Sequence, residues 1–256
     1  MTLIALEELR WPEAEALREQ NDAVGLIPTG ALEQHGPHLP LGTDYMVAEA
    51  LARAVAEKLP VPVVVTPALR AGLSDHHLAF PGTVILSQDT FRGWVDAHIA
   101  GLERIGIERV AVFSGHGGNF AFIGQLAAEH TSRQGSTRVI AYDDLFGFVR
   151  VMDEAARACG LDAPEADVHA GALETSVGLA LFAGLVGDYD GVEGYTAAEP
   201  GWTERIWADG IAALSSTGVL GDPAGATAEA GQAIFDALAD ELTGWIAREF
   251  DIPVQG

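Results

Sequence analysis

The residues best able to do chemistry lie between Gly30 and Asp44, where a glutamate, two histidines and an aspartate stand among glycines and prolines. The segment follows an apolar run over residues 23–28 that is typical of a strand. Glu33 and His35 are two residues apart, so in extended backbone both side chains can reach one point. Carboxylate oxygen and imidazole nitrogen together suit zinc, manganese or iron. This pattern favours a metal-binding loop over a merely polar one.

Two later segments carry further ligand types. His116 stands in a run of glycines directly after an apolar stretch over residues 109–113, and glycines let the backbone turn tightly and approach a ligand. His169 and Glu174 stand at the start of a predicted helix, five residues apart. On one continuous helix they would be separated by about 140°. We therefore expect them to converge only if His169 precedes the helix.

Three carboxylates and two neutral imidazoles can hold two divalent ions, because the cations offset the repulsion among the carboxylates. Asp44 is the candidate bridge, since its two oxygens can span ions about 3.5–4 Å apart. The alternative for Asp44 is a helix cap. His169 and Glu174 are the predicted catalytic residues, with His169 as an unligated acid or base. The predicted metal ligands are Glu33, His35, Asp44, His116 and Glu174.

Three other polar residues are candidate substrate contacts. Ser74 would supply a hydroxyl, and His77 would add a polar contact unless it only stabilises a turn. Asn119 would orient a ligand or cap the helix that follows it. His98 and His130 fall inside predicted helices, so we expect them to be surface or packing residues.

The composition limits the partners. The chain has 256 residues, 48% of them hydrophobic, and a formal charge of −23 that argues against nucleic acid or an anionic membrane as a partner. Cys159 is the only cysteine, so no internal disulfide and no thiolate metal cluster can form. The N-terminal residues resemble no signal peptide and no membrane span is apparent, which makes the cytoplasm the expected location.

The order of elements predicts an α/β fold with a mostly parallel central sheet and helices on both faces. With no repeat, low-complexity tract or linker, residues 1–256 are expected to form one domain. Residues 184–222 are expected to be irregular. Strands are predicted at 23–28, 61–69, 109–113 and 137–142, and helices at 11–20, 45–58, 89–105, 120–133, 145–158, 170–183 and 224–250.

Four motifs in this order resemble the creatininase family of creatinine amidohydrolases. The resemblance implies a three-layer creatininase-like fold, a binuclear zinc or manganese site, a small-molecule substrate and a homohexamer. It assigns Glu33, Asp44 and His116 to one ion, and His35, Asp44 and Glu174 to the other. The motifs are residues 33–40 with Thr43-Asp44, residues 80–83, residues 115–119 and residues 169–175.

The sequence departs from creatininase itself at positions that shape the creatinine pocket. Gly117 and Gly118 replace an aromatic residue and a carboxylate, and Glu165 and Ala166 replace a Trp-Asp pair. The resemblance therefore implies hydrolysis of an amide, cyclic amide or formamide other than creatinine. We expect substrate determinants within residues 160–168 and 184–222.

The sequence is also compatible with other functions. Within the family they are ring hydrolysis of a keto-sugar, peptide cleavage, or amide formation in a biosynthetic pathway. A metal-bound scaffold without turnover would leave His169 without a role. A nucleotide-binding module is disfavoured, because the glycines around His116 match no phosphate-binding fingerprint.

Overall fold

The computed structural model describes residues 3–20, 22–132 and 137–253. In this part of the chain five strands form one sheet in the order β1-β3-β2-β4-β5, and every neighbouring pair is parallel. The strands are β1 (Leu3–Ala5), β2 (Val24–Thr29), β3 (Val63–Val65), β4 (Arg109–Ser114) and β5 (Arg138–Ala141).

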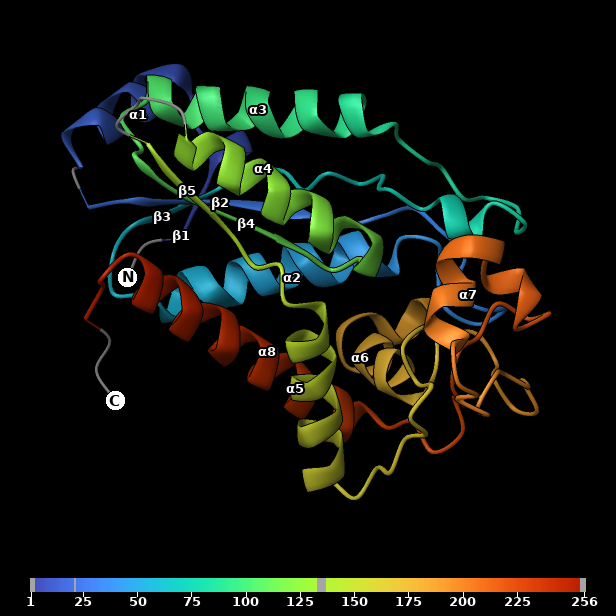
Figure 1. Ribbon diagram of the computed structural model, residues 1–256. Helices are drawn as coiled ribbons and strands as arrows, with labels where there is room; N and C mark the ends of the chain where they lie inside the picture. Colours follow the sequence, from blue (N-terminus) through green and yellow to red (C-terminus); the bar gives the residue numbers. More distant parts are fainter. Residues whose placement is uncertain (1–2, 21, 133–136, 254–256) are drawn as a thin grey trace.

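Helices cover both faces of the sheet. Helices α3 and α4 lie over one face, and α2 and α8 lie over the other, with α5 beside α8 (Figure 1). The predicted three-layer α/β fold is thus confirmed. The helices are α1 (Trp11–Ala16), α2 (Thr43–Lys58), α3 (Gln88–Arg104), α4 (Phe120–Ser132), α5 (Leu145–Ala158), α6 (Ala172–Phe182), α7 (Trp202–Asp209) and α8 (Ala228–Glu249).

The apolar runs of the central strands form two cores. In β4, Ala111 and Phe113 belong to the core beneath α2 and α8, whereas Val110 and Val112 belong to the core beneath α3 and α4. Successive side chains of a strand point to opposite faces, so a sheet covered on both sides needs a continuous apolar strand.

Three features differ from the sequence predictions. The edge strand β1 was not predicted, since three residues are too few to show a period. Strand β3 ends at Val65, shortly before Pro67, a residue that has no N–H for a ladder. Residues 184–222 are not wholly irregular, because they contain α7 between Gly201 and Gly210. The predicted end of α4 at Arg133 lies outside the described residues.

No helix among the described residues combines the length and apolar character that crossing a bilayer requires.

The topology places a crevice between β2 and β4. The chain continues from β2 to β3 on one side and from β4 to β5 on the other, so strand order reverses between the two central strands. Ligands in open α/β sheets bind beyond the carboxyl ends of the strands at such a point. Thr29 pairs with Ser114 at these ends, so the loops beginning at Gly30 and Gly115 start side by side.

Candidate active site

The loop after β2 is folded back on itself by its own backbone. The Glu33 N–H donates to the Leu41 carbonyl over 2.9 Å within the loop, and the Gly30 N–H joins the start of the loop to the segment after β3 by donating to the Leu69 carbonyl over 2.9 Å. Gly36 has φ of 62°, a left-handed conformation that glycine adopts without strain. Asp44 lies in the first turn of α2, the helix that follows the loop. The loop therefore returns Asp44 to the vicinity of Glu33 and His35.

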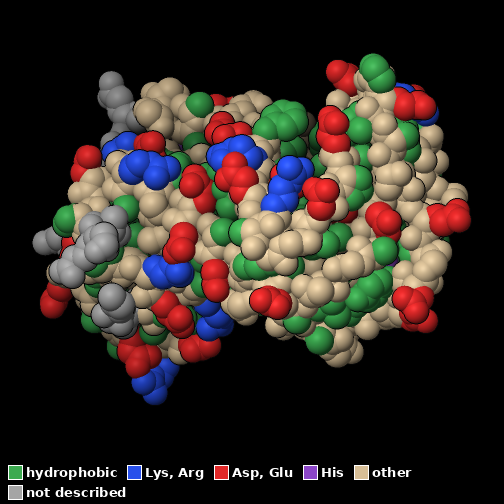
Figure 2. Space-filling model, turned by 90° about the horizontal axis from the view of Figure 1, so that it is seen from below, with side chains coloured by type: hydrophobic (Ala, Val, Ile, Leu, Met, Phe, Trp, Pro, Cys, Tyr) green, Lys and Arg blue, Asp and Glu red, His purple; other side chains and the backbone are tan. Residues whose placement is uncertain are grey.

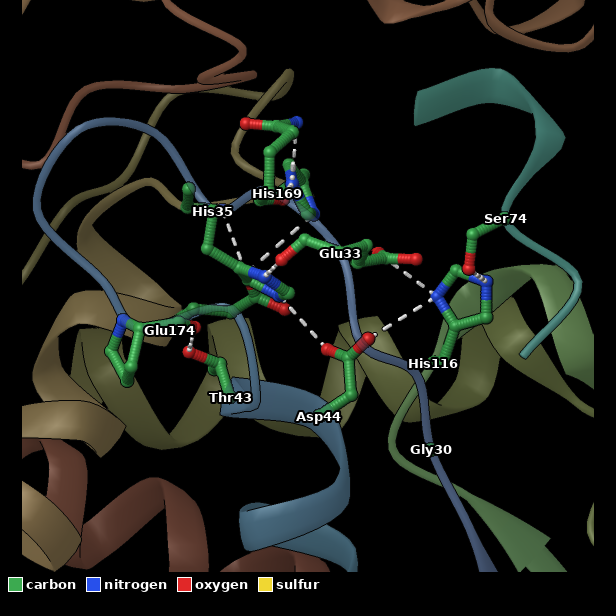
Figure 3. Close-up of polar contacts among 12 residues, drawn as sticks. Gly30, Glu33, His35, Thr43, Asp44, Ser74, His116, His169 and Glu174 are labelled. Atoms are coloured by element: carbon green, nitrogen blue, oxygen red, sulfur yellow. Dashed lines mark hydrogen bonds and ion pairs between the residues drawn. The ribbon is translucent and has the colours of Figure 1, made fainter. Parts of the chain in front are cut away.

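Asp44 lies between His35 and His116 (Figure 3). Its Oδ1 is 2.9 Å from His35 Nε2, and its Oδ2 is 3.4 Å from His116 Nδ1. Glu33 Oε1 is 3.0 Å from the same nitrogen of His116, and Glu174 Oε2 is 3.8 Å from His35 Nε2. The structure thus brings all five predicted ligands together, from the three segments in which they were predicted.

Hydrogen bonds to carbonyl groups fix which nitrogen of each imidazole can bind a cation. A carbonyl oxygen only accepts, so His35 donates its Nδ1–H to the Glu33 carbonyl over 3.1 Å. His116 likewise donates its Nε2–H to the Leu73 carbonyl over 3.2 Å. The remaining lone pairs, on His35 Nε2 and His116 Nδ1, face the carboxylate oxygens. Lone pairs that face each other at 3 Å are the arrangement that a cation between them stabilises.

The buried charges also fit a cation. Glu33 Oε2 and Asp44 Oδ2 are buried and accept no hydrogen bond from the described residues. Burial raises the pKa of the Glu33 carboxyl, and it raises that of Glu174 to about 7. Burial opposes the charged form of His35, but Asp44 and Glu174 outweigh it and raise the His35 pKa to about 10. The cluster thus favours added positive charge, so these residues fit divalent metal ions.

Three overlapping groups of residues place ligand atoms close enough to share an ion. The first two are Glu33 with His35 and Asp44, and His35 with His169 and Glu174. The third, Glu33 with His77 and His169, includes a histidine that was predicted only as a substrate contact. The His77 ring is buried, and its Nε2 is 3.1 Å from Glu33 Oε1.

Gln34 connects His77 to the rest of the loop, and sequence reasoning assigned it no role. Its amide donates to His77 Nδ1 over 3.0 Å and to the Gly218 carbonyl over 3.1 Å. Its side-chain oxygen accepts from the Gly36 N–H. Because His77 Nδ1 accepts, its Nε2–H must donate to Glu33. The sequence signal was only its position between two predicted ligands.

His169 precedes α6, as its predicted convergence with Glu174 required. Ala170 has φ of 55°, a conformation uncommon outside glycine, and its N–H donates to Glu174 Oε2 over 2.6 Å. His169 donates its Nε2–H to the Gln34 carbonyl over 2.7 Å, so the Nδ1 lone pair is directed toward Glu174 Oε2 at 3.9 Å. Burial, with His35 adding to it, holds the pKa of His169 well below its usual value.

Asp167 anchors the start of α6 and was not predicted as part of the site. Its carboxylate accepts from the N–H groups of Ala172, Leu173 and Asp222 at 2.8, 3.2 and 3.4 Å. These include amides of the first turn of α6, the turn that also holds Glu174. Asp167 therefore fixes the helix end from which Glu174 projects.

Two predicted substrate contacts are fully buried behind the ligands. Ser74 Oγ is 3.3 Å from His116 Nε2. The Asn119 amide accepts from the Leu73 N–H and donates to the Gly30 carbonyl and to Ser114 Oγ. Their polar atoms are engaged by protein groups, so a direct substrate contact stays a prediction for both. His98 and His130 lie away from this cluster, on α3 and α4.

A cavity of about 450 Å³ adjoins the cluster, and Glu33, Asp44, His116, His169 and Glu174 line its inner end. Helix α5 contributes Leu145, Phe146 and Val149 to its wall. Helix α7 contributes Trp202, Thr203, Ile206 and Trp207. The segments expected to hold substrate determinants, residues 160–168 and 184–222, thus both contribute to this wall.

Comparison with known proteins identifies relatives along most of the chain. A family model described as creatinine amidohydrolase matches residues 7–246. The mycofactocin precursor peptide peptidase of Mycobacterium tuberculosis is 35% identical over 87% of this chain and 84% of its own. The creatinine amidohydrolase of Pseudomonas putida is 30% identical over 95% of this chain and 96% of its own.

Solved structures agree with this relationship. A creatininase described as the Mn form has a TM-score of 0.77 and 28% identity, and covers 97% of this chain and 99% of its own. A mutant creatininase of Zn-Zn type has a TM-score of 0.74 and 27% identity, covering 98% and 99%. The chain therefore belongs to the creatininase family, whose members named here are hydrolases of C–N bonds.

Proposed function

We propose that this chain hydrolyses a peptide-type amide with two divalent metal ions. Glu33, Asp44 and His116 would hold one ion, and His35, Asp44 and Glu174 would hold the other. The observation that carries the proposal is that Asp44 directs separate oxygens toward His35 and His116. When bound, two such ions would polarise a carbonyl group and promote ionisation of water near neutral pH.

His169 supplies the proton transfers. Its Nε2–H is held by the Gln34 carbonyl, and its lowered pKa keeps the imidazole neutral, with Nδ1 free to accept. We propose that Nδ1 takes a proton from the attacking water and then gives it to the leaving nitrogen. Ser74, behind His116, would hold that imidazole rather than the substrate.

The substrate class is supported by the relatives and by the cavity wall. Two relatives at 35% identity are named mycofactocin precursor peptide peptidases. At the positions that shape the pocket of creatininase itself, this chain has Gly117, Gly118, Glu165 and Ala166. The apolar wall from α5 and α7 suits a side chain larger and less polar than creatinine. A formamide or cyclic amide is the alternative within the same chemistry.

Some expectations from the sequence remain proposals. Manganese and zinc are the metals named for solved relatives, and iron also suits this donor set. A single domain over residues 1–256, a homohexamer and a cytoplasmic location stay predictions.

Elemental analysis and an amide-cleavage assay test the proposal. We expect two metal ions per chain, loss of both in Asp44→Asn, and cleavage of short N-acetylated peptides that stops on chelation and returns with metal. We expect His169→Asn to keep its metal while kcat falls by about 10²–10⁴-fold. His98→Asn is the matched control and should match the wild type. Metal-independent turnover, or creatinine as the preferred substrate, would contradict the proposal.

A further inference from the structure

The cavity beside the metal ligands has an unusual balance of side chains. Nine apolar side chains line it, from α5, α7 and the segments around Val168, Ile211 and Leu220. No lysine or arginine is among its lining residues. Apart from the proposed metal ligands, Glu165 is the one carboxylate among the lining residues. Its side chain is exposed, so it lies at the edge of the cavity.

From this balance of side chains we propose that the cavity, called the chamber below, selects amides by the side chain next to the cleaved bond. The preferred side chain is apolar and carries no negative charge, and Glu165 sets this charge preference. The inference rests on the proposed function and names its substrate class. Glu165 is thereby a specificity residue, and it takes no part in the bond cleavage.

The apolar wall provides the attraction. Trp202 and Ile206 lie one helical turn apart on α7, so both contact the cavity from the same face of that helix. Trp202 and Ile206 pack with Ile211 and Leu220 in one apolar cluster, which gives this part of the wall a fixed shape. Burying an aromatic side chain against such a wall is favourable in proportion to the apolar area that is removed from water.

The charge around the chamber provides the discrimination. Between residues 161 and 225 the chain has eleven acidic residues and a single basic one, Arg205. Arg205 donates to the Ala213 carbonyl over 3.1 Å, and it is not among the lining residues. On the face shown in Figure 2, most lysine and arginine side chains lie in the left half, whereas aspartate and glutamate lie over both halves. A negative side chain against the apolar wall, away from the metal ligands, would lose hydration and meet no lysine or arginine among the lining residues.

A matched peptide series tests the proposal. The peptides are N-acetyl-Gly-X-amides in which X is phenylalanine, 4-carboxyphenylalanine, 4-aminomethylphenylalanine or glycine, with the reversed N-acetyl-X-Gly-amides as a second series. The charge sits at the far end of the ring, so a direct contact with metal does not dominate. In at least one series we expect kcat/KM for phenylalanine to exceed both glycine and 4-carboxyphenylalanine by about tenfold or more.

Two variants locate the charge preference. In Glu165→Gln the ratio of kcat/KM for the aminomethyl peptide to that for the carboxy peptide should fall by about threefold or more. Asp162→Asn removes an equal charge three residues away, from an exposed side chain outside the cavity lining, and should leave the ratio within about twofold. Equal changes in both variants would overturn the assignment of Glu165.

Binding separates this inference from the proposed function. Calorimetric titration of the same peptides into metal-loaded His169→Asn protein measures affinity without turnover. If no peptide is cleaved by the wild type but affinity follows the expected order, the proposed peptidase function fails and the chamber preference stands. If peptides are cleaved or bound with the carboxy and phenylalanine members equal, the chamber preference is wrong.

Discussion

At the scale of single residues, the site depends on which nitrogen of each histidine carries the proton. Two main-chain carbonyls orient His35 and His116 so that their lone pairs face carboxylates. A third carbonyl, that of Gln34, does the same for His169 but directs its lone pair at Glu174 and the cavity. The same kind of bond thus supports two proposed ligands and one proposed proton carrier.

A change at His77 tests how strongly metal binding depends on the hydrogen bonds that orient the proposed ligands. It donates to Glu33 and accepts from Gln34, so His77→Phe keeps a ring of similar size but removes both bonds. We expect the dissociation constant for metal to rise by about 10–100-fold, because Glu33 loses the group that orients it. Titration against a competing chelator measures this constant, with His98→Phe on α3, away from the cluster, as control. An unchanged constant would show that Glu33 needs no such support.

Asp167 predicts a pH dependence of stability. Burial raises its pKa from 3.8 to about 6, even though backbone N–H groups oppose the rise. The folded state then binds the proton more tightly than the unfolded state, so this contribution is fully present below about pH 4 and is lost as the pH rises through 6.

Urea unfolding at several pH values checks that sign. Asp167→Asn cannot titrate, so the stability of the wild type relative to the variant should fall between pH 4 and pH 7 by up to about 3 kcal/mol. A difference that is constant over this range, or that grows, would contradict the assignment.

The proposed metal ligands are visible in the sequence, whereas the residues that support them are not. The five candidate ligands could be predicted because their residue types are rare among glycines at strand ends, and the structure brings them together. Gln34 and Asp167 were missed because their roles depend on hydrogen bonds to residues far away in the sequence. Gln34 binds the Gly218 carbonyl, and Asp167 binds the Asp222 N–H.

At the scale of elements, α6 must be held close to α8 for Glu174 to reach His35. The two helices lie close together at Gly231, where an added β-carbon would overlap the Ser176 carbonyl oxygen. Gly244, on the same helix, would meet only the end of the flexible Arg248 side chain, at 3.2 Å. The two glycines therefore have different roles on one helix.

This contrast gives a matched prediction. Gly231→Ala should lower the free energy of unfolding by about 2–3 kcal/mol, since α6 must move away from α8. Gly244→Ala should be neutral or stabilise by up to about 1 kcal/mol, because alanine favours a helix over glycine. Thermal and urea unfolding measure both. Similar effects of the two changes would show that the helix contact is loose.

The elements themselves were predicted best where the apolar pattern was long. The parallel sheet followed from continuous apolar runs, of which β4 is an example, and the covering helices followed from helical periodicity. Helix α7 was missed because glycines flank it and its eight residues show barely two turns. Its formation depends on packing of Trp202 and Ile206 against distant residues, which no local pattern reports.

At the scale of the whole molecule, bound metal would join segments that are far apart in the chain. Glu33, His116 and Glu174 come from the loop after β2, the loop after β4 and the first turn of α6. An ion that binds only the folded state stabilises it, by about 4 kcal/mol when its concentration is a thousand times its dissociation constant.

Chelation should therefore lower the unfolding midpoint of the wild type. The fall in midpoint on chelation should be the same in His169→Asn. It should be nearly absent in Asp44→Asn, because that variant is expected to hold no metal. Calorimetry with and without chelator measures the midpoints. An unchanged wild-type midpoint would mean that the cluster is held together without ions.

The acidic surface between residues 161 and 225 has a kinetic consequence as well. Nine acidic residues of this region are exposed, against one basic residue, Arg205, so the region attracts divalent cations toward the adjoining cavity. Metal capture by the empty protein should accordingly be fast in dilute buffer and slow steeply as salt is added. A surface that turns anions away would thus also shorten the time the protein spends without its metal.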